Sequence, residues 1–315
     1  MPPRLAFQIP DAQDLTVGLL SAAPRPPTDS FAHMAIGFFD SGIGGLTIYR
    51  SVIDRLPHSD VIYFADQAHM PYGTRNGEEI VHLTRTGCER LFVEGCDLVI
   101  LACNTASAVA LRRLQQSWLP GFRQRLGRPA NVLGIIVPTV EVVTGRPWKA
   151  VQTAPTSAAG PQEVVGVFAT QATARSAVYE IEITKRRNDL RVITEPCPGL
   201  ASMVEEGAAP EPIRSVVNTH VRAMSVRAGA PPNKVILGST HYQVIAQFFR
   251  QSLSQRTELI DQPRATADAL EGYLVRHSEY SAGTQGLRRF LTTGSPGEPH
   301  AVEAYCGHPL RFERA

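Results

Sequence analysis

Cysteine is scarce in this chain, and the few cysteines form no recognisable pattern. The sequence of 315 residues has five, at Cys88, Cys96, Cys103, Cys197 and Cys306. None belongs to a Cys-x-x-Cys pair or stands near a histidine at metal-ligand spacing, which argues against a disulfide framework and a structural zinc site. We expect reduced thiols, as in cytosolic proteins, and no bound metal.

Long hydrophobic runs and a strong net charge are also missing. No apolar run reaches the roughly 18 residues that a membrane-spanning helix needs, and the N-terminus lacks the basic and apolar regions of a secretory signal. The formal net charge is +2, which creates no field that would attract nucleic acid or an anionic membrane. We therefore expect a cytoplasmic protein without nucleic-acid or membrane partners.

Hydrophobic residues make up 43% of the chain, which excludes bulk disorder and allows a large core without disulfides. Two stretches interrupt the globular pattern. Residues 1–33 carry six prolines and are interpreted as an N-terminal extension, whereas 144–163 are rich in Pro, Gly, Ser, Ala and Thr and indicate a linker or insertion. We expect a first lobe over 34–138 plus 245–315, and a second lobe over 139–244 that includes the insertion.

Between these breaks, short apolar runs alternate with helical stretches. The runs are almost uninterrupted, which is typical of parallel strands buried on both faces. Strands that alternate with helices favour βαβ units with right-handed crossovers. The expected strands are 35–39, 60–65, 97–102, 131–137, 163–169, 190–194 and 234–238, and expected helices begin near Leu46 and span 78–94 and 105–117. The chain is therefore predicted to be an α/β protein with mostly parallel sheets flanked by helices.

Two sequence echoes indicate that this layout occurs twice. VILACNT (99–105) resembles VILGSTH (235–241), and IGFFDS resembles VGVFAT in the same order and at a similar offset. The echo makes Cys103 and Ser239 equivalent positions in two pseudo-symmetric lobes. Each follows the carboxyl end of a predicted strand, where α/β folds place their ligands.

Three strand ends carry residues that suit proton-transfer chemistry. Asp40 opens the glycine-rich turn DSGIGG, whose backbone N–H groups either face an anion or form a tight turn. Cys103 starts a predicted helix, whose dipole is expected to lower the pKa of the thiol and favour thiolate. His241 can act as a general acid or orient one. Ser239 has no nucleophile elbow around it, so a serine hydrolase is not favoured.

Six separate motifs occur in one order along the chain. They are FDSGIGG, ADxAxxPYG, ACNTAS, ATxxTxxS, CPGL…VEEG and LGxTHY. In this order they resemble the bacterial glutamate racemases, within the aspartate/glutamate racemase superfamily, over about residues 34–300. The resemblance implies two pseudo-symmetric α/β lobes with glutamate between them. It also implies L- to D-glutamate interconversion without a cofactor, for peptidoglycan synthesis. The family is often dimeric, so a homodimer is a further implication.

The resemblance assigns roles to particular residues. The family uses one cysteine from each lobe: one removes the α-proton and the other delivers a proton to the opposite face. Cys103 matches the first, with Asp40 beside it, and would act on D-glutamate. Glu205 and His241 match the acid–base helpers of the second lobe, with Glu205 chosen over Glu206 by motif register. Substrate-holding positions are matched by Ser41, Tyr72, Gly73, Asn104, Thr105, Thr170, Thr173 and Thr240.

Ser239 departs from the family, which has the second catalytic cysteine at this position. The pKa of an alcohol lies far above that of a thiol, and loss of one acid–base group costs ~10²–10⁴-fold in rate. We expect slow or absent racemisation, with glutamate binding retained. Three explanations stay open: a cysteine replaced by serine to trap a complex; a one-thiol enzyme, such as an aspartate racemase, decarboxylase or isomerase of a dicarboxylate; and a non-catalytic glutamate-binding protein.

Overall fold

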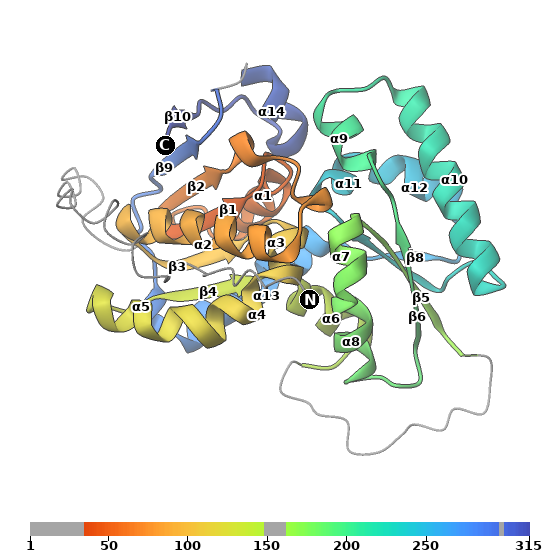
Figure 1. Cartoon of the computed structure of the whole chain (residues 1–315), viewed down its shortest axis with the longest axis horizontal. Helices are drawn as coiled ribbons and strands as arrows, with labels where there is room; N and C mark the ends of the chain where they lie inside the picture. The colour runs from red at the N-terminus through yellow and green to blue at the C-terminus, as the bar shows by residue number, and fades with distance from the viewer. Residues whose placement is uncertain (1–34, 148–161, 296–298) are drawn as a thin grey trace, which may run out of the picture.

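The computed structural model describes residues 35–147, 162–295 and 299–315, so the expected N-terminal extension and most of the expected insertion lie outside the described residues. The described chain forms two lobes, each built around its own sheet and flanked by helices (Figure 1). Every strand pair among these residues is parallel. The predicted α/β class with mostly parallel sheets is confirmed.

The two sheets share one strand layout. The first runs in the order β10-β9-β2-β1-β3-β4 and the second in the order β6-β5-β7-β8, so the order β2-β1-β3-β4 recurs as β6-β5-β7-β8. The expected repeat of one layout in two lobes is therefore present. The strands are β1 (Ala35–Asp40), β2 (Val61–Ala65), β3 (Cys96–Leu101), β4 (Asn131–Gly134), β5 (Val164–Ala169), β6 (Arg191–Pro196), β7 (Lys234–Gly238), β8 (Glu258–Leu259), β9 (Arg288–Thr292) and β10 (Glu313–Arg314).

The helices lie between the strands and on both faces of each sheet. They are α1 (Leu46–Arg55), α2 (Gly77–Val93), α3 (Asn104–Val109), α4 (Leu111–Arg113), α5 (Leu119–Leu126), α6 (Ile136–Thr144), α7 (Gln171–Ser176), α8 (Val178–Thr184), α9 (Leu200–Glu205), α10 (Pro210–Ala228), α11 (Thr240–Val244), α12 (Ala246–Ser252), α13 (Gln262–Arg276) and α14 (Pro299–Cys306), with a π-helical turn at Leu114–Trp118 and 3₁₀ turns at Gln67–His69, Tyr72–Thr74 and Ser278–Tyr280.

Local sequence explains where the long helix α2 begins. At the start of α2, the Asn76 side chain accepts a hydrogen bond from the backbone N–H of Glu79, at 2.9 Å. Glu78 and Glu79 complement the positive end of the helix in its first turn. Ile80 and Leu91 lie on the face of α2 that is buried against the first sheet. The capping residues and the apolar face together fix this helix.

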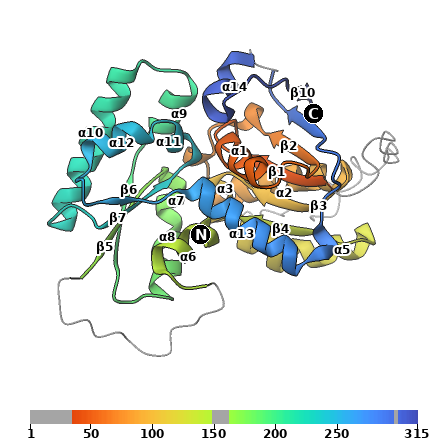
Figure 2. The same cartoon turned by 180° about the vertical axis from the view of Figure 1, so that it is seen from behind.

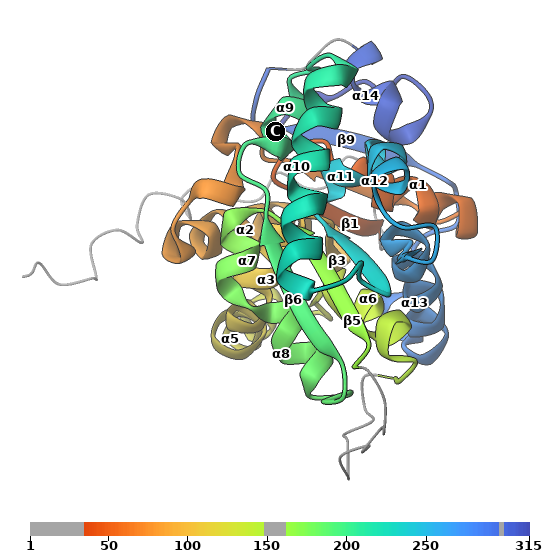
Figure 3. The same cartoon turned by 90° about the vertical axis from the view of Figure 1, so that its right-hand side faces the viewer.

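Each sheet is covered on both faces, so the apolar runs of the strands are buried. On the second sheet, α9, α10 and α12 pack against one face, while α6 and α8 pack against the other. Figure 3 shows α10 in front of that sheet, and Figure 2 shows α13 running from the junction of the lobes along the first lobe. None of the described helices is long and apolar enough to cross a membrane.

Two expectations differ from the structure for physical reasons. The strand expected over 131–137 ends at Gly134, and its last residues begin α6. Pro138 sits in the first turn of α6, where a missing N–H costs nothing, and an apolar run suits a buried strand or a buried helix equally well. The helix expected over 105–117 is divided among α3, α4 and a π-helical turn.

The junction between the lobes also differs from the expectation. The first lobe was expected to resume at residue 245, but β8 pairs with β7, and Phe248 and Phe249 pack in the core of the second sheet. The chain returns to the first lobe only at α13, which packs against α1. The segment from 245 to about 260 therefore belongs with the second sheet, and the crossing point lies just before Gln262.

Candidate active site in the cleft between the lobes

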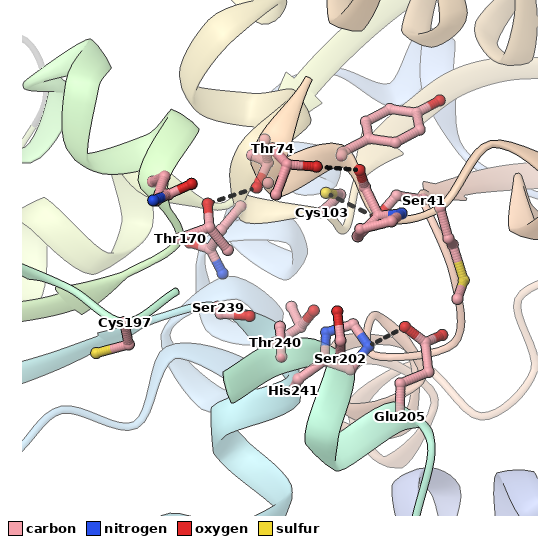
Figure 4. Close-up of a pocket in the computed structure, with 18 of the residues that line it drawn as sticks. Ser41, Thr74, Cys103, Thr170, Cys197, Ser202, Glu205, Ser239, Thr240 and His241 are labelled. Carbon is pink, nitrogen blue, oxygen red and sulfur yellow. Dashed lines mark hydrogen bonds and ion pairs between the residues drawn. The ribbon is translucent and has the colours of Figure 1, made fainter. Parts of the chain in front are cut away.

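The carboxyl ends of strands from both sheets meet at one cleft. Figure 4 shows Cys103 and Ser41 on one side of this opening, and Ser239, Thr240 and His241 on the other. The residues of the sequence prediction that line the cleft are Ser41, Tyr72, Gly73, Cys103, Asn104, Thr105, Thr170, Glu205, Ser239, Thr240 and His241. Asp40 and Thr173 are buried just behind the lining. The structure thus brings together residues that are far apart in sequence.

Cys103 occupies the N-terminal cap of α3, directly after β3. Its Sγ accepts a hydrogen bond from the backbone N–H of Ala106 at 3.4 Å and lies 3.3 Å from Ser41 Oγ. Burial, followed by the nearby charge of Asp40, raises the pKa of the Cys103 thiol to about 11, although both hydrogen bonds lower it. The expected lowering of this pKa by the helix is therefore wrong, because desolvation is the larger effect.

We predict that alkylation of Cys103 reports this raised pKa. Because only thiolate reacts, the iodoacetamide rate at Cys103 should rise about tenfold per pH unit from pH 7 to 10 without levelling off. Asp40→Asn removes the negative charge that opposes thiolate, so its rate should exceed the wild-type rate at each pH. Peptide mass spectrometry measures both. A plateau near the ordinary thiol pKa of about 8.5 would contradict the prediction.

Asp40 is fully buried beneath the turn that follows β1. Its Oδ2 accepts hydrogen bonds from the backbone N–H of Gly45 at 2.8 Å and from the hydroxyl of Tyr63 at 3.2 Å. Its Oδ1 has no hydrogen-bond partner among the described residues. Burial raises the pKa of Asp40, and the charge of His241 works in the opposite direction. Because Asp40 does not line the cleft, it acts on the cleft through its charge.

His241 and Glu205 form a buried pair on the second-lobe side. His241 Nε2 lies 2.9 Å from Glu205 Oε2, and Glu205 Oε1 accepts a weak hydrogen bond from the backbone N–H of Ile43 at 3.4 Å. Burial alone lowers the pKa of His241, but the hydrogen bond and charge of Glu205, with the charge of Asp40, raise it overall above its ordinary value. The imidazole is therefore held ready to carry a proton beside the cleft.

Gly42 allows this pair to form. A Cβ atom at Gly42 would lie 2.4 Å from Glu205 Oε1, so any larger residue would push the carboxylate away from the first lobe. The glycine-rich turn DSGIGG thus serves as a close approach between the two lobes. Glu205 is the member of the Glu205–Glu206 pair that faces His241, in agreement with the motif register.

Three threonine hydroxyls join the lobes on the opposite side of the cleft. Thr105 Oγ1 lies 3.0 Å from Thr170 Oγ1, which donates to Thr173 Oγ1 at 3.1 Å, and Thr173 Oγ1 lies 3.4 Å from Thr105 Oγ1. Gly73 packs tightly on this cluster, because a Cβ there would lie 2.9 Å from Thr170 Cβ. Hydroxyls that bond mainly to one another can turn toward a carboxylate that enters the cleft.

The Tyr72 loop is anchored from below. The Tyr72 hydroxyl donates to Asp66 Oδ2 at 2.6 Å, and Asp66 Oδ1 also accepts from the hydroxyl of Thr293 at 2.8 Å. The hydrogen of the Tyr72 phenol is therefore used by Asp66 and is not available to a molecule in the cleft. Asp66 belongs to the motif ADxAxxPYG, but no local pattern indicates that it supports Tyr72.

Ser239 stands opposite Cys103 and is equivalent to it. Ser239 caps α11 directly after β7, as Cys103 caps α3 directly after β3. Its side chain makes no capping hydrogen bond, and it is 4% exposed. Cys197 also lines the cleft, but its thiol contacts the carbonyl of Glu195 at 3.6 Å and points away from Ser239 in Figure 4. Cys103 is therefore the thiol that the described cleft presents.

Several lining residues were not singled out from the sequence. They are Met70, Pro71, Thr74, Gln171, Cys197, Pro198, Gly199, Ala201 and Ser202. Most belong to the loops after β2 and β6, which contain two of the sequence motifs. Their position in these loops was the only feature of the sequence that could have indicated them as lining residues. The described residues contain no group of acidic, histidine and cysteine side chains that could hold a metal ion.

The cleft has acid–base groups on two sides, each at an equivalent strand end. This arrangement defines the class of two-lobed α/β isomerases that move a proton on a bound molecule. A curated glutamate racemase from Phenylobacterium zucineum is 56% identical over 283 residues, which cover 90% of this chain and 100% of that protein. One from Caulobacter sp. is 57% identical with the same coverage. The chain belongs to the glutamate racemase family.

A solved structure agrees with this assignment. The glutamate racemase of Francisella tularensis, crystallised in complex with D-glutamate, matches with a TM-score of 0.73 at 27% identity, over 90% of this chain and 98% of that one. No protein-family model matches the chain. The relatives favour a glutamate racemase over the aspartate racemase, decarboxylase, isomerase and binding-protein alternatives.

Proposed function

We propose that this chain interconverts L- and D-glutamate by proton transfer at the α-carbon without a cofactor, and that Ser239 makes the second-lobe half of the reaction slow. The relatives support the substrate and the reaction, and the Francisella protein crystallised in complex with D-glutamate supports glutamate as the ligand. The product would serve peptidoglycan synthesis.

One observation carries the proposal. Cys103 and Ser239 cap equivalent helices after equivalent strands, and both line the same cleft. Inversion at a carbon needs one group that takes a proton from one face and another that gives a proton to the opposite face. Two copies of one strand–turn–helix unit, facing each other, supply these positions.

The first-lobe half of the reaction follows from the groups around Cys103. Its thiolate accepts the α-proton of D-glutamate and becomes a thiol, while the electron pair stays on the substrate as a carbanion. The threonine hydroxyls and the backbone N–H groups at the strand ends stabilise the negative charge. Bound glutamate displaces water from the cleft, which strengthens these interactions.

The second-lobe half is where this chain differs. The group at position 239 must give a proton to the carbanion from the opposite face, or take the α-proton from L-glutamate in reverse. The hydroxyl of Ser239 is far less acidic than a thiol and its alkoxide is essentially absent near neutral pH. His241 and Glu205 line the same cleft and supply charge and a proton reservoir.

We also propose a cytoplasmic location and a homodimer. All five cysteines are free thiols in the structure, which fits a reducing compartment. The proposed substrate is a small anion, and we propose no nucleic-acid or membrane partner. The homodimer rests on the family resemblance.

Hydrogen exchange tests the proposed function. The purified protein in D₂O should remove the α-proton signal of D-glutamate from the proton NMR spectrum, with little change of optical rotation in the same sample. L-Glutamate should exchange far more slowly, because its α-proton faces Ser239. Exchange from neither enantiomer would overturn the proposed activity. Rapid exchange together with loss of optical rotation would confirm racemisation and refute the role given to Ser239.

A further inference from the structure

Four buried polar side chains meet where the two lobes join. They are Asn104 on α3, Thr139 on α6, Tyr179 on α8 and Gln262 at the start of α13, each no more than 2% exposed. Asn104 Nδ2 donates to Gln262 Oε1 at 2.8 Å, and Gln262 Nε2 lies 3.2 Å from Asn104 Oδ1, so the two amides face each other in opposite directions. Gln262 lies outside all six sequence motifs.

The hydrogen bonds fix the orientation of both amides in turn. The Thr139 hydroxyl donates to the backbone carbonyl of Ile135 at 2.8 Å, so its oxygen must accept from Gln262 Nε2, at 2.9 Å. The amide oxygen of Gln262, Oε1, therefore faces Asn104. The Asn104 atom that meets it must be a donor, which is Nδ2. The Tyr179 hydroxyl donates to Asn104 Oδ1 at 2.7 Å and accepts from Gln262 Nε2 at 3.0 Å.

This bonding has a consequence for the cleft that Asn104 lines. Asn104 Oδ1 already accepts a hydrogen bond from the Tyr179 hydroxyl and faces Gln262 Nε2, whereas Nδ2 uses one of its two hydrogens. The hydrogen left over is a donor, which suits a carboxylate. The opposite orientation would present a carbonyl oxygen and repel it.

We propose that Gln262 is a positioning residue for substrate binding, which holds the Asn104 amide so that its free N–H serves the anionic substrate in the cleft. The inference rests on the proposed function, because it takes that substrate to be glutamate. Tyr179 supports the same orientation from the second lobe. Because Asn104 directly follows Cys103, the network also ties the thiol-bearing turn to the segments that cross between the lobes.

Protection of Cys103 by D-glutamate against alkylation tests the positioning role of Gln262 without requiring turnover. For each variant, the D-glutamate concentration that halves the iodoacetamide rate at Cys103 is measured by peptide mass spectrometry. Gln262→Leu keeps the bulk of the side chain and removes the amide, so half-protection should need about 10- to 100-fold more D-glutamate, as for loss of one hydrogen bond to a charged group. Tyr179→Phe should shift half-protection in the same direction by a smaller factor.

Thr266→Val is the matched control on the same helix. The Thr266 hydroxyl is buried and donates to the backbone carbonyl of Gln262 at 2.9 Å, so its loss affects the stability of α13 and leaves the amide pair in place. It should lower the melting temperature without moving half-protection. If Gln262→Leu does not fold, Tyr179→Phe still decides the outcome.

The outcomes separate this inference from the proposed function. Loss of protection in Gln262→Leu and Tyr179→Phe, with Thr266→Val unchanged, supports the positioning role. Unchanged half-protection in a folded Gln262→Leu or in Tyr179→Phe overturns it, as does an equal shift in Thr266→Val. If D-glutamate fails to protect the wild-type protein, the proposed substrate is wrong, and the inference falls with it.

Discussion

Ser239→Cys is expected to raise the rate of glutamate racemisation by ~10²–10⁴-fold, the usual contribution of one positioned acid–base group. Ser239 already has the required place, since it caps α11 after β7 as Cys103 caps α3 after β3. Sulfur in place of oxygen lowers the pKa of the group toward neutral pH. The His241–Glu205 pair lines the same cleft as position 239.

Circular dichroism of D-glutamate and of L-glutamate measures the gain in both directions. Ser202→Cys is a useful control, because it adds a thiol to the same cleft from α9 and not from a strand end. It should give no comparable gain. If Ser239→Cys racemises no faster than the wild type, then either the alcohol already acts in catalysis or another step limits the rate.

The strand ends could be predicted because their physical signal is local. Strands such as 97–102 and 234–238 are short apolar runs closed by small or polar residues, and parallel strands place such ends on one edge of the sheet. The echo between the two runs therefore predicted that Cys103 and Ser239 take equivalent places. The structure shows the same strand order around both.

The remaining features depend on contacts that no local pattern encodes. Gln262 lies 158 residues from Asn104 in sequence, and nothing near either residue marks the other as its partner. The sequence also suggested a lowered pKa for Cys103 from the helix alone, because the depth of burial that outweighs the helix is known only after the lobes are packed. Apolar runs near Gly134 fit a strand or a helix until their neighbours are known.

Cys103→Ala is expected to reduce exchange of the D-glutamate α-proton by at least ~10²–10⁴-fold. The reason is that Cys103 is the thiol that faces the described cleft, whereas Cys197 directs its sulfur to the carbonyl of Glu195. Proton NMR in D₂O measures the exchange. Cys197→Ala should keep most of it, and equal losses in the two variants would show that the cleft itself, and not one thiol, had been damaged.

Moving the thiol across the cleft gives the sharpest form of this prediction. In the double variant Cys103→Ser, Ser239→Cys the first lobe carries the hydroxyl and the second lobe the thiol, at positions that the repeated fold makes equivalent. In the proposed mechanism each lobe serves one face of the α-carbon, so the variant should exchange the α-proton of L-glutamate and spare D-glutamate. A variant that still prefers D-glutamate would mean that the enantiomer is chosen by how the cleft holds the substrate, and not by which lobe carries the thiol.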